Sequence, residues 1–206
     1  MIISLIGMSN VGKSYWSKII SDKLNYQRFS IDEMIAEKIF EDYGINLADE
    51  TEMSSWMGQP NQPQYVKNSQ IYLQIEDKMT NQVLDSIDRN SAVVIDTTGS
   101  LVHLNERTLN KLSQKSRVIH LQNDQSKLEQ MITEYIELPK PVFWADFFYF
   151  SGDFKNSVAN SYPKLLDYRI SRYQKLAHRT IAFDQHRKLN EAEVTDLIKL
   201  AENDCS

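Results

Sequence analysis

The fold of this chain is decided by a stretch close to its first residue, Gly7-Met8-Ser9-Asn10-Val11-Gly12-Lys13-Ser14, which fits the pattern G-x-x-x-x-G-K-[ST]. Its glycines let the backbone fold tightly, so that successive N–H groups point inward at phosphate oxygens. A lysine at the position of Lys13 supplies a cation for the β- and γ-phosphates, and a hydroxyl at the position of Ser14 binds Mg²⁺. Such a pattern arises by chance in roughly one chain in a hundred of this size. The stretch therefore predicts an ATP site with bound Mg²⁺, whose nucleotide-binding residues are Gly7, Ser9, Asn10, Val11, Gly12, Lys13, Ser14 and Tyr15.

The surroundings of this stretch agree with that interpretation. Residues 2–6 form a short apolar run typical of a buried strand, and residues 13–24 carry apolar groups at helical spacing. A phosphate loop needs a strand before it and a helix after it, because the first N–H groups of the helix face the anion. Both elements are predicted here.

Strands and helices alternate along the rest of the chain. Further strands are predicted at 26–29, 92–96, 117–121 and 180–183. Helices are predicted from about 31, with Ser30 or Asp32 as the cap, and at 65–88, 105–113, 124–136, 163–177 and 190–203. Residues 44–64 are left unassigned apart from a loop at 58–63, and 137–161 are expected to be irregular. This order predicts an α/β protein, a three-layer α/β/α sandwich with a parallel sheet of about five strands.

We expect one P-loop domain over residues 1–206, with a helical segment at about 31–89 and an aromatic-rich lid insertion at about 136–162. With 28 acidic and 23 basic residues the net charge is −5, which argues against duplex nucleic acid as a partner. The apolar runs are too short to span a bilayer, and the first residues lack a cationic signal region, so no membrane partner is expected. The single cysteine, Cys205, fits a reducing cytoplasm. A monomer or weak homodimer is expected.

Two acidic residues follow predicted strands, at the sheet edge where ligands bind in open parallel sheets. Asp32 can accept a proton or a hydrogen bond from a substrate hydroxyl, or it caps the following helix. Asp96 ends an apolar strand, a pattern typical of a carboxylate in the Mg²⁺ shell, or it caps the turn that follows. Within that turn, Thr98 and Gly99 are candidates for binding the substrate.

Cations that could complete the site come from later segments. Arg169 suits an anionic substrate group because of its planar fork of donors, and the alternative for it and for Arg172 is a surface arginine. Lys140 lies in the aromatic-rich insertion, which can be a lid over the phosphates, a partner surface or local core. The four histidines show no ligand spacing and are expected to be structural or surface residues: His103, His120, His178 and His186.

Over roughly residues 1–200 the chain resembles the shikimate kinase family of small P-loop kinases. The resemblance rests first on the Gly7–Ser14 loop, which matches the family's phosphate loop. Phe29-Ser30-Ile31-Asp32 falls at the family's Asp-x-Asp pair, and Thr97-Thr98-Gly99 falls at its triple-glycine turn. Lys140-Pro141 falls near its lid Arg-Pro, and Arg169 with Tyr173 and Ala177 matches its Arg-x-x-x-Tyr helix. It implies a nucleoside-monophosphate-kinase-like fold and transfer of the γ-phosphoryl group of ATP to a small-molecule hydroxyl. It makes Lys13, Asp32 and Lys140 the catalytic residues, and Asp32, Thr98, Gly99 and Arg169 the substrate-binding residues.

The chain departs from the family on the acceptor side. Ser30 replaces the first acid of the pair, which leaves Asp96 as the candidate to join Ser14 at Mg²⁺, and the triple glycine is reduced to Gly99. Leu73 stands where the family has an arginine for the shikimate carboxylate, so shikimate is expected to be a poor substrate. The alternatives are a kinase for gluconate or a nucleoside, and a nucleotide-binding protein with weak or no kinase activity.

Overall fold

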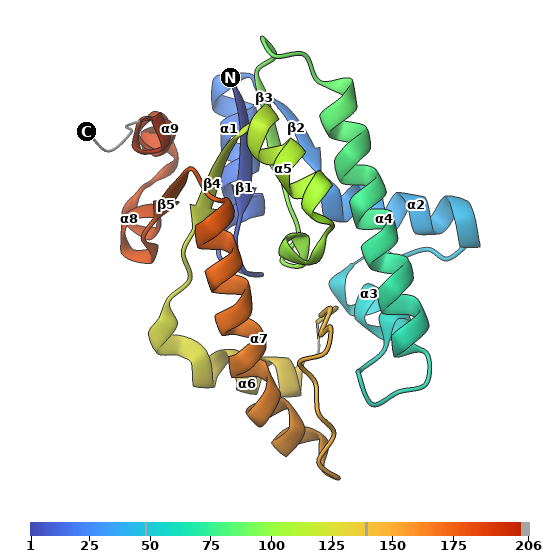
Figure 1. The fold of residues 1–206 in the computed structure, drawn as a ribbon. Helices are drawn as coiled ribbons and strands as arrows, with labels where there is room; N and C mark the ends of the chain where they lie inside the picture. Colours follow the sequence, from blue (N-terminus) through green and yellow to red (C-terminus); the bar gives the residue numbers. More distant parts are fainter. Residues whose placement is uncertain (48, 139, 203–206) are drawn as a thin grey trace.

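The computed structural model describes residues 1–47, 49–138 and 140–202, so Cys205 lies outside the described residues. Five parallel strands form one sheet in the order β2-β3-β1-β4-β5 (Figure 1). Their bounds are β1 Ile2–Ile6, β2 Gln27–Ser30, β3 Val93–Asp96, β4 Arg117–Leu121 and β5 Arg179–Ile181. The predicted α/β class and the five parallel strands are confirmed.

The central strand β1 explains why the sheet has two cores. Its side chains alternate between the faces, so that Ile2 and Ile6 enter one apolar cluster while Ile3 and Leu5 enter the other. All five of its residues are buried, as expected for a strand covered on both sides. The alternation makes the architecture three-layered.

Helices from different parts of the chain cover the two faces. One face packs against α1 (Lys13–Leu24) and α9 (Val194–Glu202) through Trp16, Ile20 and Leu197. The other face is covered by four helices, α2 Ile31–Tyr43, α4 Tyr65–Ser86, α5 Glu106–Lys115 and α7 Phe154–Leu176 (Figure 1). The remaining helices are α3 Glu50–Met57, α6 Leu128–Glu137, α8 Phe183–Lys188 and the 3₁₀ turns η1 Leu101–His103, η2 Gln125–Lys127 and η3 Glu191–Glu193.

Three helices, α7, α3 and α8, differ from the sequence-based expectation. Helix α7 begins at Phe154 rather than near 163, because the Asp153 side chain caps it by accepting the Asn156 N–H at 2.8 Å. The end of the expected lid therefore belongs to a regular helix, which continues through Pro163. Helix α3 in the unassigned segment is likewise capped by Asp49, and α8 was not expected.

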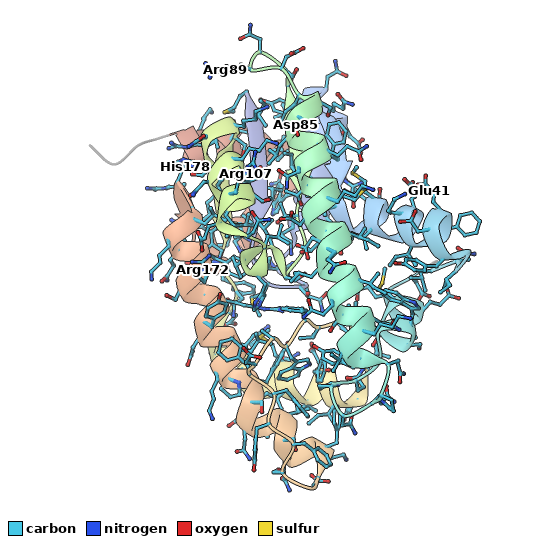
Figure 2. All side chains as sticks on the ribbon, turned by 45° about the vertical axis from the view of Figure 1, so that its right-hand side comes forward. Glu41, Asp85, Arg89, Arg107, Arg172 and His178 are labelled. Atoms are coloured by element: carbon cyan, nitrogen blue, oxygen red, sulfur yellow. The ribbon has the colours of Figure 1, made fainter. Side chains whose placement is uncertain are left out.

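The outer helical surface is polar and carries several ion pairs. Arg172 on α7 pairs with Glu106 at the start of α5, and Lys111 pairs with Asp85 at 2.7 Å, on the side that Figure 2 turns forward. His178 follows α7 and accepts the Val118 N–H at 3.0 Å. Arg172 is therefore a surface residue. Within the described ranges, no helix combines the length and the apolar character needed to cross a membrane.

Candidate functional site

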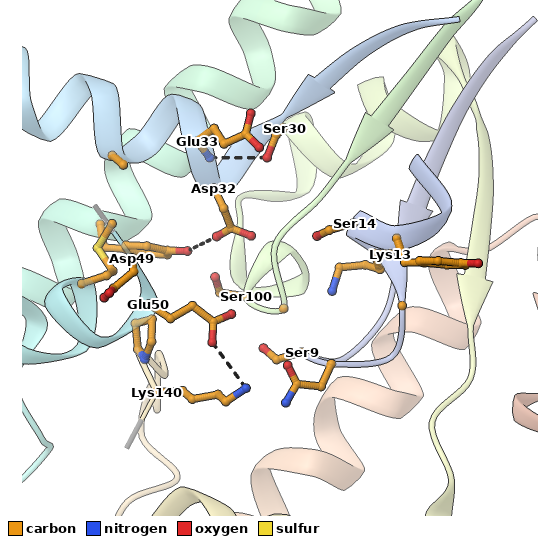
Figure 3. Close-up of a pocket in the computed structure, with 18 of the residues that line it drawn as sticks. Ser9, Lys13, Ser14, Ser30, Asp32, Glu33, Asp49, Glu50, Ser100 and Lys140 are labelled. Carbon is orange, nitrogen blue, oxygen red and sulfur yellow. Dashed lines mark hydrogen bonds and ion pairs between the residues drawn. The ribbon is translucent and has the colours of Figure 1, made fainter. Parts of the chain in front are cut away.

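A cavity of about 680 Å³ opens at the carboxyl ends of the strands. It is a size that accommodates small molecules and cofactors. The loop after β1 lines one end, and the start of α2, the start of α3 and one face of α4 line the other (Figure 3). The lining also includes Lys140, Pro141 and Phe143 and three arginines, Arg28, Arg169 and Arg187. The segments that the sequence placed at the sheet edge thus surround one space.

The loop at residues 7–14 has the backbone geometry of a phosphate cradle. Gly7 has a φ of 143°, and a Cβ at that position would lie 2.6 Å from the carbonyl oxygen of Leu121. Only glycine fits so close a contact. Gly12, with a φ of 107°, stands directly before α1, and the Arg187 guanidinium donates to the Asn10 carbonyl at 2.9 Å. The N-terminus of α1 therefore faces the cavity, where its N–H groups favour an anion.

Six of the eight expected nucleotide residues line this cavity: Ser9, Asn10, Gly12, Lys13, Ser14 and Tyr15. Val11 is buried in the core of the α1 face and lines a neighbouring cavity, while the role of Gly7 is confined to the turn. Lys13 folds back over the loop, with its Nζ donating to the carbonyls of Gly7 at 3.0 Å and Met8 at 2.9 Å. Burial lowers the pKa of Lys13, and the carboxylates of Asp32 and Asp96 oppose that shift.

Asp32 lies across the cavity from Lys13 and Ser14 (Figure 3). It stands in the first turn of α2, which Ser30 caps by accepting the Glu33 N–H at 3.5 Å. The Tyr72 hydroxyl of α4 donates to Asp32 Oδ1 at 3.1 Å. The carboxylate is open to the cavity but enclosed by protein on its other sides, and this burial raises its pKa, with Lys13 acting in the opposite direction. Ser30 is thus the helix cap, and the second carboxylate oxygen of Asp32 can accept a hydrogen bond from a ligand.

Asp96 is already engaged on one side. Its Oδ2 accepts from Arg28 at 3.1 Å and from the Ser17 hydroxyl at 3.2 Å. Arg28 also reaches Glu33, at 3.0 Å. The other carboxylate oxygen, Oδ1, is buried and has no hydrogen-bond partner among the described residues. Asp96 keeps one oxygen as an acceptor beneath α1, and its part in binding Mg²⁺ stays a prediction.

The turn after β3 is fixed by a residue that the sequence analysis did not single out. Glu76 of α4 is fully buried and accepts hydrogen bonds from the Thr98 hydroxyl and, at 2.6 Å, from the Ser100 hydroxyl. Burial raises the pKa of Glu76 to about 7, although both hydroxyls oppose the shift. Thr98 therefore turns to Glu76, and Gly99 and Ser100 line the cavity in its place. The sequence did contain a signal for Glu76, because an acidic residue within the apolar stripe of the helix predicted at 65–88 is unusual.

Gly99 brings the turn against the phosphate loop. A Cβ at Gly99 would lie 3.1 Å from the Ser9 hydroxyl oxygen and 3.8 Å from an Arg169 guanidinium nitrogen. The Tyr173 hydroxyl donates to the Gly99 carbonyl at 2.5 Å. Arg169 itself donates from Nε to His103 at 3.2 Å and from another nitrogen to the Phe143 carbonyl at 2.8 Å. Arg169 thus lies beside the cavity with donors to spare, because a guanidinium has five.

Lys140 reaches the cavity from the insertion. Its Nζ lies 3.3 Å from Glu50 Oε2, at the start of α3 (Figure 3). The segment around it is pinned to α4, since the Tyr65 hydroxyl donates to the Val142 carbonyl at 3.1 Å and accepts the Trp144 N–H at 2.7 Å. In this structure the predicted lid residue is therefore held by Glu50 of α3.

The aromatic residues of the insertion divide into two groups. Phe143 and Trp144 are buried, and Trp144 packs edge-on against Tyr135 and Phe148. Tyr149 and Phe150 are exposed. Of the three interpretations of this cluster, local core describes its buried members.

The histidines have structural contacts, as expected. His120 is buried against Tyr173 and His103 against Phe143, and burial lowers their pKa values to about 4 and about 3. His186 contacts the Gln122 carbonyl at 2.9 Å. Among the described residues there is no group of three or more His, Cys, Asp or Glu side chains placed to hold a metal.

One expected position is corrected by the helix register. Leu73 packs against the apolar core and does not line the cavity, whereas its neighbour Tyr72 does. Successive residues of a helix point about 100° apart, so a shift of one position moves a side chain to another face. The cavity is also lined by four residues of the segment that the sequence left unassigned, Leu47, Asp49, Glu50 and Met53.

A smaller cavity of about 240 Å³ adjoins the loop on its far side. Phe183 at the start of α8 lines it, and its ring is contacted by the cations of Lys127 and Arg187, 5.7 and 5.5 Å from the centroid. Met8, Asn10 and Val11 connect it to the phosphate loop. The two cavities therefore meet at the loop.

No family model and no curated protein sequence matches the chain. Solved structures do match over nearly its whole length. The shikimate kinase from Bacteroides thetaiotaomicron has a TM-score of 0.64 at 16% identity, covering 98% of this chain and 99% of that one. The shikimate kinase from Acinetobacter baumannii in complex with shikimate has a TM-score of 0.60 at 17% identity, covering 97% and 91%. That from Aquifex aeolicus has a TM-score of 0.57 at 18% identity, covering 98% and 96%.

These similarities agree with the strand order, the phosphate loop after β1 and the cavity at the carboxyl ends of the strands. They extend over the unassigned segment and the insertion as well, because the coverage is almost complete in both directions. The chain has a shikimate kinase-like fold.

Proposed function

We propose that this chain is an ATP- and Mg²⁺-dependent kinase that transfers the γ-phosphoryl group to a hydroxyl of a small molecule. The observation that carries the proposal is that Lys13 and Ser14 of the phosphate loop and the carboxylate of Asp32 face one another across a single cavity. Phosphoryl transfer asks for positioning and for charge stabilisation rather than for covalent chemistry by the protein. This arrangement offers both.

In the proposed reaction the acceptor oxygen forms a bond to the γ-phosphorus, and the bond from that phosphorus to the β,γ-bridging oxygen breaks. ADP leaves, and the hydroxyl proton passes to Asp32 as the acceptor oxygen is phosphorylated. Burial favours this step, because a raised pKa makes Asp32 a better proton acceptor, provided that it starts ionised. Lys13 and Lys140 would neutralise charge on the phosphates.

The donor set fits Mg²⁺, a hard cation that prefers oxygen ligands and keeps several waters. The Ser14 hydroxyl borders the cavity, and Asp96 has one buried oxygen without a partner among the described residues. We assign Ser14 to the cation directly and Asp96 through water. The cation would supply charge stabilisation to the phosphates.

We place the nucleoside of ATP in the smaller cavity, with its base against Phe183. The phosphate loop joins the two cavities, so a nucleotide bound there would direct its phosphates toward the acceptor end. The fold neighbours support a small-molecule acceptor, since the A. baumannii kinase is in complex with shikimate.

The second candidate is a nucleotide-binding protein with weak or no kinase activity. It is favoured by one contact, the 3.1 Å ion pair of Arg28 with Asp96, which occupies Oδ2 and offsets the carboxylate charge that would attract Mg²⁺. Gluconate and nucleosides remain candidate acceptors within the kinase class.

ADP formation from ATP and Mg²⁺ in the presence of a panel of hydroxyl compounds tests the proposal. Lys13→Ala should lower turnover by about a hundredfold or more, because it removes one preorganised charge at the phosphates. The matched control is Lys23→Ala, an exposed lysine of the same helix, which should retain turnover. Equal turnover by Lys13→Ala and the unmodified chain would refute the kinase. Nucleotide binding without acceptor-dependent ADP formation would favour the second candidate.

A further inference from the structure

The floor of the acceptor end is built from hydroxyls that rest on carboxylates. Tyr72 and Ser100 line the cavity, and both are almost fully buried. The Tyr72 hydroxyl donates to Asp32 at 3.1 Å, and the Ser100 hydroxyl donates to Glu76 at 2.6 Å. The second oxygen of Glu76 accepts from Thr98, so both of its oxygens are used.

The direction of these hydrogen bonds determines what the floor offers to a ligand. An ionised carboxylate is an acceptor only, so the hydroxyl protons of Tyr72 and Ser100 point at Asp32 and Glu76. A hydroxyl has one proton, and what remains for the cavity is its oxygen lone pairs. The second oxygen of Asp32 is an acceptor as well. The floor therefore presents hydrogen-bond acceptors.

The side wall has the same character. Asp49 belongs to the cavity lining and uses Oδ1 to accept the Thr51 and Glu52 N–H groups at 2.8 and 2.9 Å, so its Oδ2 is left as a further acceptor. Glu50 lies next to it. Asp49 and Glu50 stand on the side of the cavity away from Lys13 and Ser14 (Figure 3).

Two cations of the cavity, Arg169 and Lys140, lie where it meets the smaller cavity beside the phosphate loop, whereas Arg28 is engaged by Glu33 and Asp96. Arg169 lies beside Gly99, which itself approaches Ser9. Ser9, Lys140 and Arg169 line both cavities. A bound triphosphate would claim these cations, because charge-assisted bonds to phosphate oxygens are the strongest available there. The end of the cavity that binds the phosphoryl acceptor would then keep an acidic lining, rich in hydrogen-bond acceptors.

We propose that the acceptor of this kinase is a polyhydroxyl compound that donates hydrogen bonds into the Asp32, Tyr72, Ser100 and Asp49 lining and carries no carboxylate at that end. A carboxylate is itself acceptor-only, so it would face lone pairs and like charges. A hydroxyl or an ammonium group supplies the missing protons. This inference rests on the proposed kinase function and specifies its substrate class.

The test compares glucose with glucosamine and glucuronate, each of which differs from glucose in one group. In parallel it compares three carbocyclic compounds, an inositol, an aminocyclitol and shikimate, of which shikimate alone carries a carboxylate. Binding is measured by calorimetry and thermal shift with an inert ATP analogue and Mg²⁺ present. The assays run at about pH 8.5, above the pKa of about 7 that burial gives Glu76, so that its carboxylate is ionised. In at least one set the hydroxyl or amine member should bind at least roughly tenfold more tightly than the carboxylate member.

Glu76→Gln examines the reason for the preference. The variant has nearly the same shape, but its amide donates to Thr98 or Ser100 and so frees one hydroxyl proton for the cavity. The ratio between hydroxyl and carboxylate binding should fall by roughly fivefold. Glu37→Gln, an exposed acid of α2 outside the cavity lining, removes the same charge and should leave the ratio unchanged.

Each outcome decides the proposal. It is overturned if the carboxylate members bind as tightly as their partners or more tightly, or if no hydroxyl or amine member binds. If Glu76→Gln fails to fold, the comparison of hydroxyl and carboxylate compounds on the unmodified chain still decides whether the proposal holds. Binding of the ATP analogue is measured separately: its absence refutes the kinase, whereas analogue binding with a preference for carboxylates refutes only the acceptor class.

Discussion

The ion pair between Arg28 and Asp96 allows stability and metal binding to be tested with one substitution, Arg28→Gln. Arg28 joins β2 to β3 and to α1, since its Nε donates to Ser17 at 2.9 Å and a terminal nitrogen donates to Asp96 at 3.1 Å. The Asp96 side chain is only 3% exposed. Removing the arginine therefore leaves a carboxylate buried without its counter-ion.

Breaking a buried pair by removing one partner destabilises a protein by about 3–5 kcal/mol. Asp96 keeps its hydrogen bond from Ser17, and Arg28 is 16% exposed, so the lower end of that range applies. A loss of about 3 kcal/mol corresponds to a fall in Tm of roughly 6–12 °C for a chain of this size. Urea unfolding and calorimetry without nucleotide measure it.

Glu33→Gln is the matched control. Glu33 is the second partner of Arg28, at 3.0 Å, but it is 62% exposed. Exposed pairs contribute about 0–1 kcal/mol, so the control should change the free energy of unfolding by less than about 1 kcal/mol. Equal losses for the two variants would refute the assignment of the buried pair as the stabilising one.

The same variant tests the metal assignment. With Arg28 removed, Oδ2 of Asp96 keeps only the hydrogen bond from Ser17 and loses its competing cation, so the Mg²⁺ concentration needed for half-maximal binding of an inert ATP analogue should fall. If Arg28→Gln is destabilised as expected but its Mg²⁺ dependence is unchanged, Asp96 is a structural acid and does not serve the cation.

Further outcomes are expected from other contacts. Asp96→Asn should raise the Mg²⁺ concentration for half activity and Ser30→Asp should lower it or leave it unchanged, as a Mg²⁺ titration would show; an unchanged titration for Asp96→Asn would refute its role. Because burial raises the pKa of Glu76 from 4.5 to about 7, its stabilising effect is present below pH 4.5 and lost as the pH rises to 7. Urea unfolding of the unmodified chain should therefore lose about 3 kcal/mol relative to Glu76→Gln over that window, and parallel pH profiles would contradict the shift. Tyr173→Phe removes the donor to the Gly99 carbonyl and should cost about 1–2 kcal/mol on unfolding, with turnover reduced because Gly99 shifts from Ser9; unchanged unfolding and turnover would argue against that contact.

The sequence predicted the fold because local signals agreed with one another. The phosphate-loop pattern fixed residues 7–14, and apolar runs at 2–6 and 93–96 have the length and composition of buried strands. Helix α3 escaped prediction because its apolar residues are few and its start depends on the Asp49 cap. A short helix with little periodicity gives a weak pattern, and tertiary contacts decide it.

The candidate site was predictable in its loop and less so in its acceptor end. Lys13 and Ser14 are defined by a local motif, whereas the contacts of Asp96 and Glu76 join residues that are far apart in the chain. Composition and spacing carry no information on which arginine reaches which acid. The register of α4 is equally hidden, since resemblance selects Leu73 while the helix turns Tyr72 into the cavity.

The ion pair of Lys140 with Glu50 connects the two ends of the site. Glu50 is 66% exposed and the pair spans 3.3 Å, so its contribution is small, about 1 kcal/mol or less. A triphosphate with several charges can therefore take Lys140 from Glu50 at little cost. Once Lys140 turns to the phosphates, Glu50 becomes a further acceptor on the wall that Asp49 begins. Nucleotide binding would thus increase the acidity of the acceptor end and, with it, the preference for a hydrogen-bond donor over a carboxylate.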